Sequence, residues 1–248
     1  MVGARPLRSP LALLALLAVL ALLLGCGRSA AAPKAAHLSS GESCGRLVAL
    51  TFDDGPNPPF TQQILQILES NGVKATFFVE GQAAEANPDT VKLLDAAGMD
   101  VESHSYSHSE TLATADAATF RADLDAASAA FEGILGRQPA LYRPPFGNTS
   151  DAMLRELADA GYTSIGWDVD STDWQEADPS KIVDAVLSQV HRGAIVLMHD
   201  GGLSGGNPDR TATIQALPSI LAGLRERGYE LKTVSQIIDP AVCNSTGS

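Results

Sequence analysis

From Arg46 onward the chain alternates between two kinds of segment, and this alternation constrains the fold more than any other feature. Short apolar runs rich in Val, Ile and Phe are typical of buried strands. They span residues 46–52, 75–79, 99–103, 163–169, 194–198 and 230–234. Longer stretches with helical spacing lie between them, at 59–71, 87–97, 115–135, 150–160, 179–190 and 212–227. The alternation predicts an α/β fold with parallel strands and helices packed outside.

The number of strand–helix units favours a barrel over an open sheet, because six or seven of them follow one another. Glycines follow four of the predicted helices where C-caps belong, which supports this division: Gly72, Gly98, Gly161 and Gly228. Active sites in such folds lie at the carboxyl ends of the strands. Polar residues that directly follow an apolar run are therefore the first candidates for function.

Asp53 and Asp54 are the first such residues, since they end the apolar run 47–52 and precede the turn residues Gly55-Pro56. Two adjacent carboxylates repel each other, so the pair requires a cation or a shared proton. His104 and His108, spaced i, i+4, follow another apolar run. A local helical turn would bring both rings to one side.

One of these carboxylates and the two imidazoles form a three-ligand set with room for water, as in a catalytic zinc site. The second carboxylate is then free to act as a base. Two His and one carboxylate also describe the triad of a mononuclear iron oxygenase. We favour hydrolysis, because the second carboxylate and a late histidine, His199, have a role there and none in oxygen chemistry.

His199 follows the most apolar run, 194–198, and precedes a Gly-rich loop, so we expect it to project into the barrel mouth. In the stiff segment 142–147, Arg143 offers a planar donor fork suited to a carboxylate. The segment 167–174 combines both Trp residues of the chain with three Asp residues. Residues 202–206 match the G-x-S-x-G nucleophile elbow. No His follows Ser204, so we interpret this match as a flexible loop.

The N-terminal segment is typical of a secretory signal, because Arg5 and Arg8 precede an apolar run from Leu11 to Leu24 that is short for a spanning helix. The tetrapeptide that ends at Cys26 resembles a bacterial lipobox, in which the Cys is lipidated. A plain secretory signal that happens to contain a Cys is the alternative. We predict an exported protein, anchored by lipid at the outer face of the membrane or otherwise secreted.

We divide the chain into a signal (1–25), a flexible Ala/Ser/Gly-rich linker (26–43), a catalytic domain (44–243) and a polar tail (244–248). With Cys26 lipidated, Cys44 and Cys243 form an even pair in an exported protein, and we predict a disulfide between them. The formal net charge of −12 makes nucleic acid an unsuitable partner and fits a neutral substrate better.

Together these segments resemble the polysaccharide deacetylases of carbohydrate esterase family 4, the NodB-homology domain. The resemblance covers about Cys44 to Ile238. It rests on five motifs in the family's order: Thr51-Phe52-Asp53-Asp54-Gly55, His104-Ser105-Tyr106-Ser107-His108, Arg143-Pro144-Pro145-Phe146-Gly147, Asp170-Ser171-Thr172-Asp173-Trp174 and Leu197-Met198-His199. The family's fold is a distorted (β/α) barrel, in agreement with the alternation of strands and helices.

The resemblance implies a role for each motif. Asp54, His104 and His108 would hold a divalent metal, commonly zinc, with cobalt and other divalent ions tolerated. Asp53 would be the general base, and Arg143 would orient it and keep it ionised. His199 would be the general acid, Asp173 the carboxylate that orients it, and Phe146 the backbone donor to the oxyanion. The substrate pocket would be lined by Trp174, Leu197 and Tyr142.

The expected function is metal-dependent removal of N-acetyl groups from a GlcNAc-containing polysaccharide, with release of acetate. Chitin oligomers, peptidoglycan and exopolysaccharides are all amides of similar shape. An O-acetyl esterase, such as an acetylxylan esterase, is the alternative enzyme. An inactive cell-surface glycan-binding domain is the alternative from another class; it would not need both an Asp53 base and a His199 acid.

Overall fold

The computed structural model describes residues 1, 3, 36–42, 45–202 and 208–241 of the 248-residue chain. The chain divides into two units, 1–32 and 33–248, and every element named below belongs to the second. Several predictions fall outside the described residues: the signal segment, Cys26, the Cys44–Cys243 disulfide, the loop centre at 203–207 and the tail. Within the described residues, no helix is long and apolar enough to cross a membrane.

Within the described residues, nine strands form one sheet in which the paired strands run parallel. The strands are β1 (His37–Leu38), β2 (Leu47–Gly55), β3 (Thr76–Val79), β4 (Asp100–Ser103), β5 (Leu141–Tyr142), β6 (Thr163–Ile165), β7 (Val169–Asp170), β8 (Ala194–His199) and β9 (Glu230–Leu231). Their order is β1-β6-β5-β4-β3-β2-β8-β7, and β9 pairs with β2. Ser40, just after edge strand β1, forms an antiparallel bridge to Ala194 of β8 next to the other edge. The predicted barrel is therefore confirmed in a distorted form.

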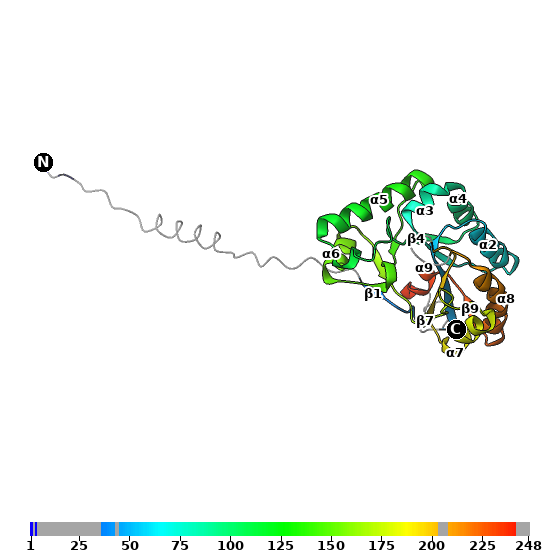
Figure 1. The fold of residues 1–248 in the computed structure, drawn as a ribbon. Coiled ribbons are helices and arrows are strands. Elements are labelled where there is room, and N and C mark those ends of the chain that lie inside the picture. The colour runs from blue at the N-terminus through cyan, green and yellow to red at the C-terminus, as the bar shows by residue number, and fades with distance from the viewer. Residues whose placement is uncertain (2, 4–35, 43–44, 203–207, 242–248) are drawn as a thin grey trace. The chain divides into compact units, whose positions relative to one another are not determined.

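Helices surround the outside of this sheet, as Figure 1 shows. They are α2 (Phe60–Ser70), α3 (Gly81–Ala86), α4 (Pro88–Ala96), α5 (Ala117–Leu135), α6 (Asp151–Asp159), α7 (Pro179–Gln189), α8 (Thr211–Glu226) and α9 (Val234–Ile237), with short 3₁₀ turns η1 (Leu112–Thr114) and η2 (Pro145–Gly147). Local capping explains two of the starts. Asp116 accepts a hydrogen bond from Thr119 N before α5, and Ser150 accepts one from Met153 N before α6.

Alternation along β2 builds both the core and the site. Val48, Leu50 and Phe52 pack into the large apolar cluster with residues of the surrounding helices. Leu47 and Ala49 point the other way, into a second apolar cluster that includes residues of α9. Thr51 and Asp53 continue this inner face toward the carboxyl end of the strand, so the barrel interior changes from apolar to polar as β2 approaches its end.

The segment assigned to the linker contributes to the sheet. β1 pairs with β6, Gly166 N donates to Leu38 O at 2.8 Å, and Gly41 N donates to Gly193 O at 2.8 Å. The Ala/Ser/Gly-rich composition suggested a tether, but these backbone hydrogen bonds fix residues 36–42 against the catalytic domain. Residues 36–42, assigned to the linker from composition, are therefore part of the sheet structure.

Two predicted strands have a different form in the structure. The apolar run 163–169 is divided into β6 and β7, which pair with β5 and β8 respectively and lie at opposite ends of the strand order. The run 230–234 contains only the two-residue β9 before α9 begins. Polar residues interrupt both segments, and each forms shorter elements than a single continuous strand.

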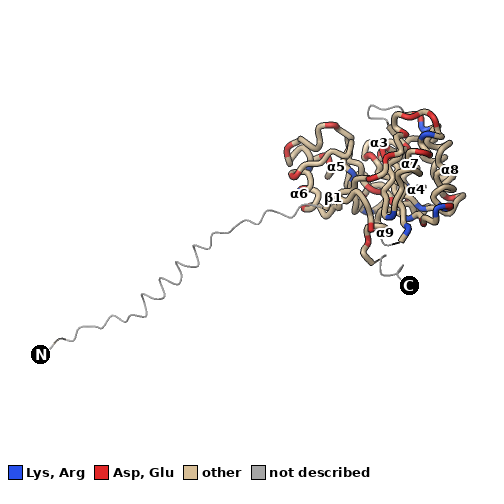
Figure 2. The backbone as a smooth tube through the Cα atoms, turned by 90° about the horizontal axis from the view of Figure 1, so that it is seen from below, with Lys and Arg blue, Asp and Glu red and all other residues tan. Residues whose placement is uncertain are grey.

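Acidic residues outnumber basic residues and lie over much of the fold (Figure 2). Asp and Glu number 29 against 17 Lys and Arg in the whole chain. Figure 2 shows acidic positions over much of the described fold, including the neighbourhood of α3.

Candidate active site

A bulge at the end of β2 determines how the two adjacent aspartates are presented. Asp53 pairs in register with Phe78, but the register shifts before Gly55 pairs with Val79, which leaves Asp54 as the extra residue with φ of 70°. Successive residues of a regular strand point to opposite faces, and a bulge re-aims one of them. Both carboxylates consequently reach the same cavity.

The two histidines lie on a loop that follows β4, not on the helical turn that their spacing allowed. His104 Nδ1 lies 2.8 Å from Arg143 O. A carbonyl oxygen only accepts, so Nδ1 carries the proton and leaves Nε2 of the neutral ring free to bind a metal. His108 N donates to Ser105 Oγ at 2.9 Å, and its buried Nδ1 has no hydrogen-bond partner among the described residues.

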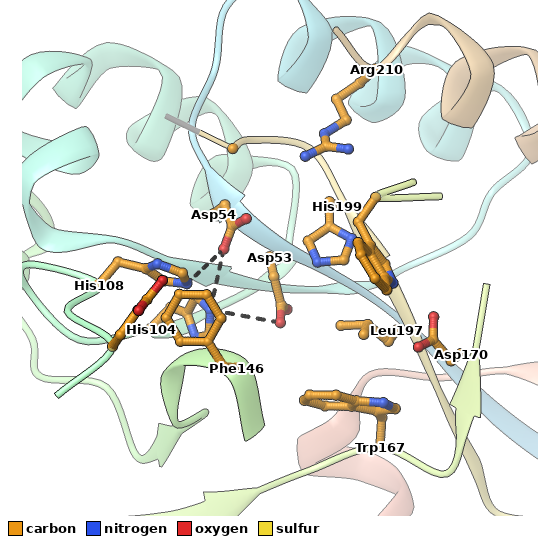
Figure 3. A pocket seen from close by; sticks show the side chains of 13 residues that line it. Asp53, Asp54, His104, His108, Phe146, Trp167, Asp170, Leu197, His199 and Arg210 are labelled. Atoms are coloured by element: carbon orange, nitrogen blue, oxygen red, sulfur yellow. Dashed lines mark ion pairs between the residues drawn. The ribbon is translucent and has the colours of Figure 1, made fainter. Parts of the chain in front are cut away.

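Three ligand atoms converge at this point, as Figure 3 shows. Asp54 Oδ1 lies 3.3 Å from His104 Nε2 and 3.2 Å from His108 Nε2. Two ligands bound at about 2.1 Å to a tetrahedral ion are about 3.4 Å apart. The spacing and the N/N/O donor set therefore fit a divalent metal such as zinc. No other such group of His, Cys, Asp and Glu occurs within the described ranges.

Electrostatics favour an ionised Asp54 and a protonated His104 in the metal-free protein. Burial raises the pKa of Asp54, but hydrogen bonds from His104 and His108 outweigh it and hold the pKa well below its usual range. Burial lowers the pKa of His104, and the charges of Asp53 and Asp54 outweigh that effect and raise it. The concentrated negative charge attracts a proton in the metal-free protein, and a bound cation would take its place.

Asp53 is fixed by a fully buried arginine. Arg143 Nη1 donates to Asp53 Oδ1 at 2.7 Å and to Thr51 Oγ1 at 2.7 Å, and Nη2 donates to Gly166 O at 2.9 Å. The guanidinium also lies over the Phe78 ring at 4.1 Å. Burial lowers the pKa of Arg143, and the adjacent Asp53 opposes this shift. The second oxygen of Asp53 lies 3.8 Å from His104 Nε2, beside the predicted metal position.

A second acid–base pair lies across the cavity. His199 Nδ1 is 2.7 Å from Asp173 Oδ1, while Asp173 Oδ2 accepts hydrogen bonds from His199 N at 2.9 Å and from Thr213 Oγ1 at 2.8 Å. Burial lowers the pKa of His199, but the charge of Asp173 outweighs it and raises the pKa to about 9. The imidazole is therefore protonated at neutral pH and can act as an acid.

These groups line one cavity of about 380 Å³. Figure 3 shows Asp53 between the metal-ligand set and His199, with Trp167 and Leu197 on the adjacent wall. The cavity brings together most of the predicted site residues, including Phe146 and Trp174 at its rim, where both side chains are about half exposed.

Comparisons with known proteins agree with this geometry. A sequence model of the family described as polysaccharide deacetylase matches residues 40–165. A peptidoglycan-N-acetylglucosamine deacetylase of Bacillus cereus is 35% identical over 195 residues, which cover 78% of this chain and 88% of that protein. The chain belongs to the polysaccharide deacetylase family. It is thus a member of a family of hydrolases that act on carbon–nitrogen bonds, and the resemblance stated from the motifs is confirmed.

Two further comparisons extend this relationship. A chitooligosaccharide deacetylase of Sinorhizobium fredii is 36% identical over 194 residues, covering 76% of this chain and 90% of that protein. The crystal structure of the Bc1960 peptidoglycan N-acetylglucosamine deacetylase superposes with a TM-score of 0.77 at 31% identity, covering 82% of this chain and 93% of that one. The shared fold of the deacetylases therefore covers nearly all of the second unit.

One expected pocket residue of this deacetylase lies elsewhere. Tyr142 is fully buried and packs with Phe120, Tyr162 and other apolar residues between α5, α6 and the sheet. Arg143 points into the barrel interior, so its neighbour in extended backbone must point to the opposite side. Trp167 takes the corresponding place on the cavity wall.

Two charged residues of the deacetylase cavity were not predicted from any motif. Glu110 follows His108 closely and lines the cavity from an exposed position. Arg210 lies just before α8, is almost fully buried and donates from Nε to Gly201 O at 2.5 Å. Neither belongs to a recurrent local pattern. The tertiary fold brings them to the site.

Backbone conformation marks the same region. Within the described part of the chain, five residues other than glycine have positive φ, and each lies in or beside a predicted site motif: Asp54, Ser105, His108, Phe146 and Thr172. Such conformations are disfavoured for residues with a Cβ and persist where the surroundings enforce them, often at functional sites.

Proposed function

We propose that this chain is a metal-dependent N-deacetylase that hydrolyses the acetamido group of a GlcNAc-containing polysaccharide and releases acetate. The observation that carries the proposal is one cavity in which a carboxylate held by Arg143 lies between a three-ligand set and a protonated imidazole. Metal-assisted amide hydrolysis uses these three functions together, and glycan binding alone needs none of them.

Asp54, His104 and His108 would hold the ion through the three atoms that converge in the cavity. The chemistry that a divalent ion supplies there is polarisation of the acetyl carbonyl and a lowered pKa of the attacking water. Asp53, beside this set, takes the proton from that water as the new carbon–oxygen bond forms. The hydrogen bond from Arg143 at 2.7 Å holds the Asp53 carboxyl group in position for this transfer.

His199 completes the reaction on the other side. When the carbon–nitrogen bond breaks, the leaving amine requires a proton, and the imidazolium with its pKa of about 9 carries one at neutral pH. Asp173 holds the ring by its Nδ1, so Nε2 is the atom that delivers the proton. The backbone N–H of Phe146 is proposed as a donor to the oxyanion, and Leu197 and Trp174 as the wall for the acetyl methyl.

The substrate class follows from the relatives and the cavity. Named relatives act on peptidoglycan N-acetylglucosamine and on chitooligosaccharides. Exposed aromatic side chains at the rim, Phe146 and Trp174, offer apolar faces to a sugar ring. We therefore propose a β-linked GlcNAc polymer as substrate, and retain an O-acetyl ester such as acetylxylan as the alternative that the same site could cleave.

Location and covalent state are proposed from the sequence alone. The Arg-flanked apolar run and Cys26 support export and lipid attachment at the outer face of the membrane, and the even pair Cys44 and Cys243 supports a disulfide. Mass spectrometry of the mature protein tests both: a mature form that lacks Cys26, or two free thiols after oxidative expression, would contradict them.

The deciding experiment is acetate release by the purified protein with added Zn²⁺ from chitooligosaccharides, peptidoglycan and acetylxylan. Asp53→Asn should lower kcat by at least about 100-fold, because a positioned base typically contributes that much. Its zinc affinity should stay close to that of the unmodified protein, since Asp53 is not among the three converging ligands.

Asp89→Asn is the matched control, because Asp89 lies on α4 with its side chain 97% exposed. It should retain full activity on the preferred glycan. Near-full activity of Asp53→Asn would contradict the assignment of the base. Release from acetylxylan alone would replace the amidase with the esterase.

A further inference from the structure

The five residues from His104 to His108, here called the ligand loop, carry two of the three predicted metal ligands. Ser105 and His108 have positive φ, of 67° and 50°. A segment with two residues in this disfavoured region does not hold its shape without help from its surroundings. Groups outside the loop must therefore hold this backbone conformation.

One carboxylate of α5 binds the middle of the ligand loop. Asp123 Oδ1 accepts a hydrogen bond from Tyr106 N at 2.8 Å, and Oδ2 accepts two from Ser107, from N at 3.1 Å and from Oγ at 2.5 Å. Both oxygens of Asp123 are thus occupied by donors of the loop. Hydrogen bonds to an ionised acceptor are stronger than those between neutral groups, and here two of them bind consecutive backbone amides.

The opposite side of the loop is held by α3, through two backbone hydrogen bonds and one exposed side-chain bond, from Tyr106 Oη to Glu85 Oε2 at 2.9 Å. Gly81 N donates to Ser105 O at 2.9 Å, and Gln82 N donates to Tyr106 O at 3.1 Å. The first turn of α3 therefore fixes the carbonyls of the loop while Asp123 fixes its amides. Gly81 is also where the Tyr106 ring approaches, since a Cβ there would lie 2.6 Å from Tyr106 Cδ2. None of these α3 contacts involves Asp123, so a substitution of Asp123 removes its own hydrogen bonds and leaves the α3 bonds in place.

We infer that Asp123 is a positioning residue of the metal site: its carboxylate holds the ligand loop in the conformation that turns both imidazoles toward Asp54. This inference rests on the proposed metal dependence, and it assigns a role to a residue outside every motif of the sequence. Without the carboxylate, the two consecutive amides lose their acceptor and the loop is free to leave its disfavoured backbone conformation. Metal binding must then order the loop, which lowers the affinity.

The first measurement is the zinc affinity of the metal-free full-length protein, by competition with a chromogenic chelator. Asp123→Ala should bind zinc about 10- to 100-fold more weakly, the usual range for partners that orient metal ligands. Asp123→Asn should lie between this variant and the unmodified protein, because its amide oxygen can still accept from the loop while its amide nitrogen cannot accept from any of the three loop donors. Ser107→Ala removes only the hydroxyl bond and should lose less than Asp123→Ala.

Asp125→Asn is the matched control. Asp125 lies two residues further along α5, its side chain is 63% exposed, and it pairs with Arg121 Nε at 2.9 Å rather than with the loop. Asp125→Asn removes one negative charge from α5, as Asp123→Asn does, and should leave zinc affinity unchanged. An equal loss in Asp125→Asn and Asp123→Asn would assign the effect to net charge and overturn the inference.

A purely structural role is separated by spectroscopy. The visible absorption of the Co²⁺-substituted protein reports the ligand geometry at the ion, and thermal unfolding of the metal-free protein reports the stability of the fold. We expect a changed or weaker Co²⁺ spectrum for Asp123→Ala with α5 still folded. If that variant does not fold, Asp123→Asn, which keeps the size of the side chain, decides by the same two readouts.

The outcomes distinguish this inference from the proposed function. If the unmodified protein binds neither Zn²⁺ nor Co²⁺, the proposed metal dependence fails. If it binds both ions and the Asp123 variants bind them with the same affinity and spectrum, only the role of Asp123 fails.

Discussion

On one side of the cavity Asp54, His104 and His108 lie on a bulge and a loop, where two of the three have positive φ; we call these residues the metal side. On the other, His199 ends a regular strand and is held by Asp173 and, through it, by Thr213; these three form the acid side. Backbone conformation thus sets the geometry of the metal side, and one side-chain pair sets that of the acid side.

The difference predicts two kinds of response to mutation. Three ligands around one ion act as a unit, so loss of any one should abolish the site. The acid side tunes one proton equilibrium, so substitutions there should shift a pH profile by degrees. Arg143 connects the metal side to the proposed base, because its carbonyl accepts from His104 Nδ1 while its guanidinium holds Asp53.

The largest expected effect is on the metal side. His108→Ala removes one of three ligands and should lose the bound ion, with a fall in kcat/KM of about 1,000-fold or more, because the metal supplies several kcal/mol of transition-state stabilisation. Metal content by elemental analysis and acetate release are the measurements. His191→Ala is the control, since His191 is exposed and pairs with Asp168 at 3.1 Å away from the cavity. Retention of both ion and activity in His108→Ala would end the distinction between the two sides.

A graded effect is expected for Asp173→Asn. The general acid must be protonated, so activity is present below the pKa of His199, about 9, and is lost as the pH rises through it. Removal of the Asp173 charge lets burial lower that pKa toward its ordinary value of 6.5 or below. The alkaline limb of kcat/KM should move to lower pH, with about tenfold less activity at pH 8.

Asp178→Asn controls for the loss of a nearby carboxylate, because Asp178 is exposed and caps α7 by accepting from Ser180 N at 2.9 Å. Its alkaline limb should coincide with that of the unmodified protein. An unshifted limb in Asp173→Asn would assign the limb to a group other than His199.

The sequence predicted the parts of the site that end long, buried strands. β2 and β8 are continuous apolar runs in which burial determines strand formation, so Asp53 at the end of one and His199 at the end of the other could be placed from pattern alone. Their pairing in the sheet matches Asp53 with His199 directly. Asp53 and His199 are neighbours because β2 lies beside β8 in the sheet, and the sequence alone does not specify this strand order.

Shorter elements could not be predicted in the same way. β5 has two residues, and a two-residue strand has no period that would show which side chain faces inward. The family resemblance alone placed Tyr142 in the pocket, and nothing local showed that it packs on the opposite side from Arg143. The bulge at Asp54 and the positive φ of Ser105 arise from contacts with distant segments. Ordering of residues 36–42 likewise depends on partners in β6 and β8. Each miss reflects tertiary contact that overrides local composition.

The smallest expected effect tests how finely the acid side is tuned. Thr213 is buried and donates to the Asp173 oxygen that also accepts from His199 N. Thr213→Val removes this donor at similar shape and should lower the free energy of unfolding by about 1–2 kcal/mol.

Its effect on pH should be opposite in sign to that of Asp173→Asn. A carboxylate that has lost a donor concentrates its charge on the remaining partner, so Asp173 should hold the imidazolium more strongly. The alkaline limb should then rise by less than about one pH unit. Thr213→Ser keeps the hydroxyl and should leave both stability and limb nearly unchanged. A shift of the alkaline limb to lower pH in Thr213→Val would contradict this account, because it would mean that the Thr213 hydroxyl stabilises the His199 imidazolium rather than weakening its pairing with Asp173.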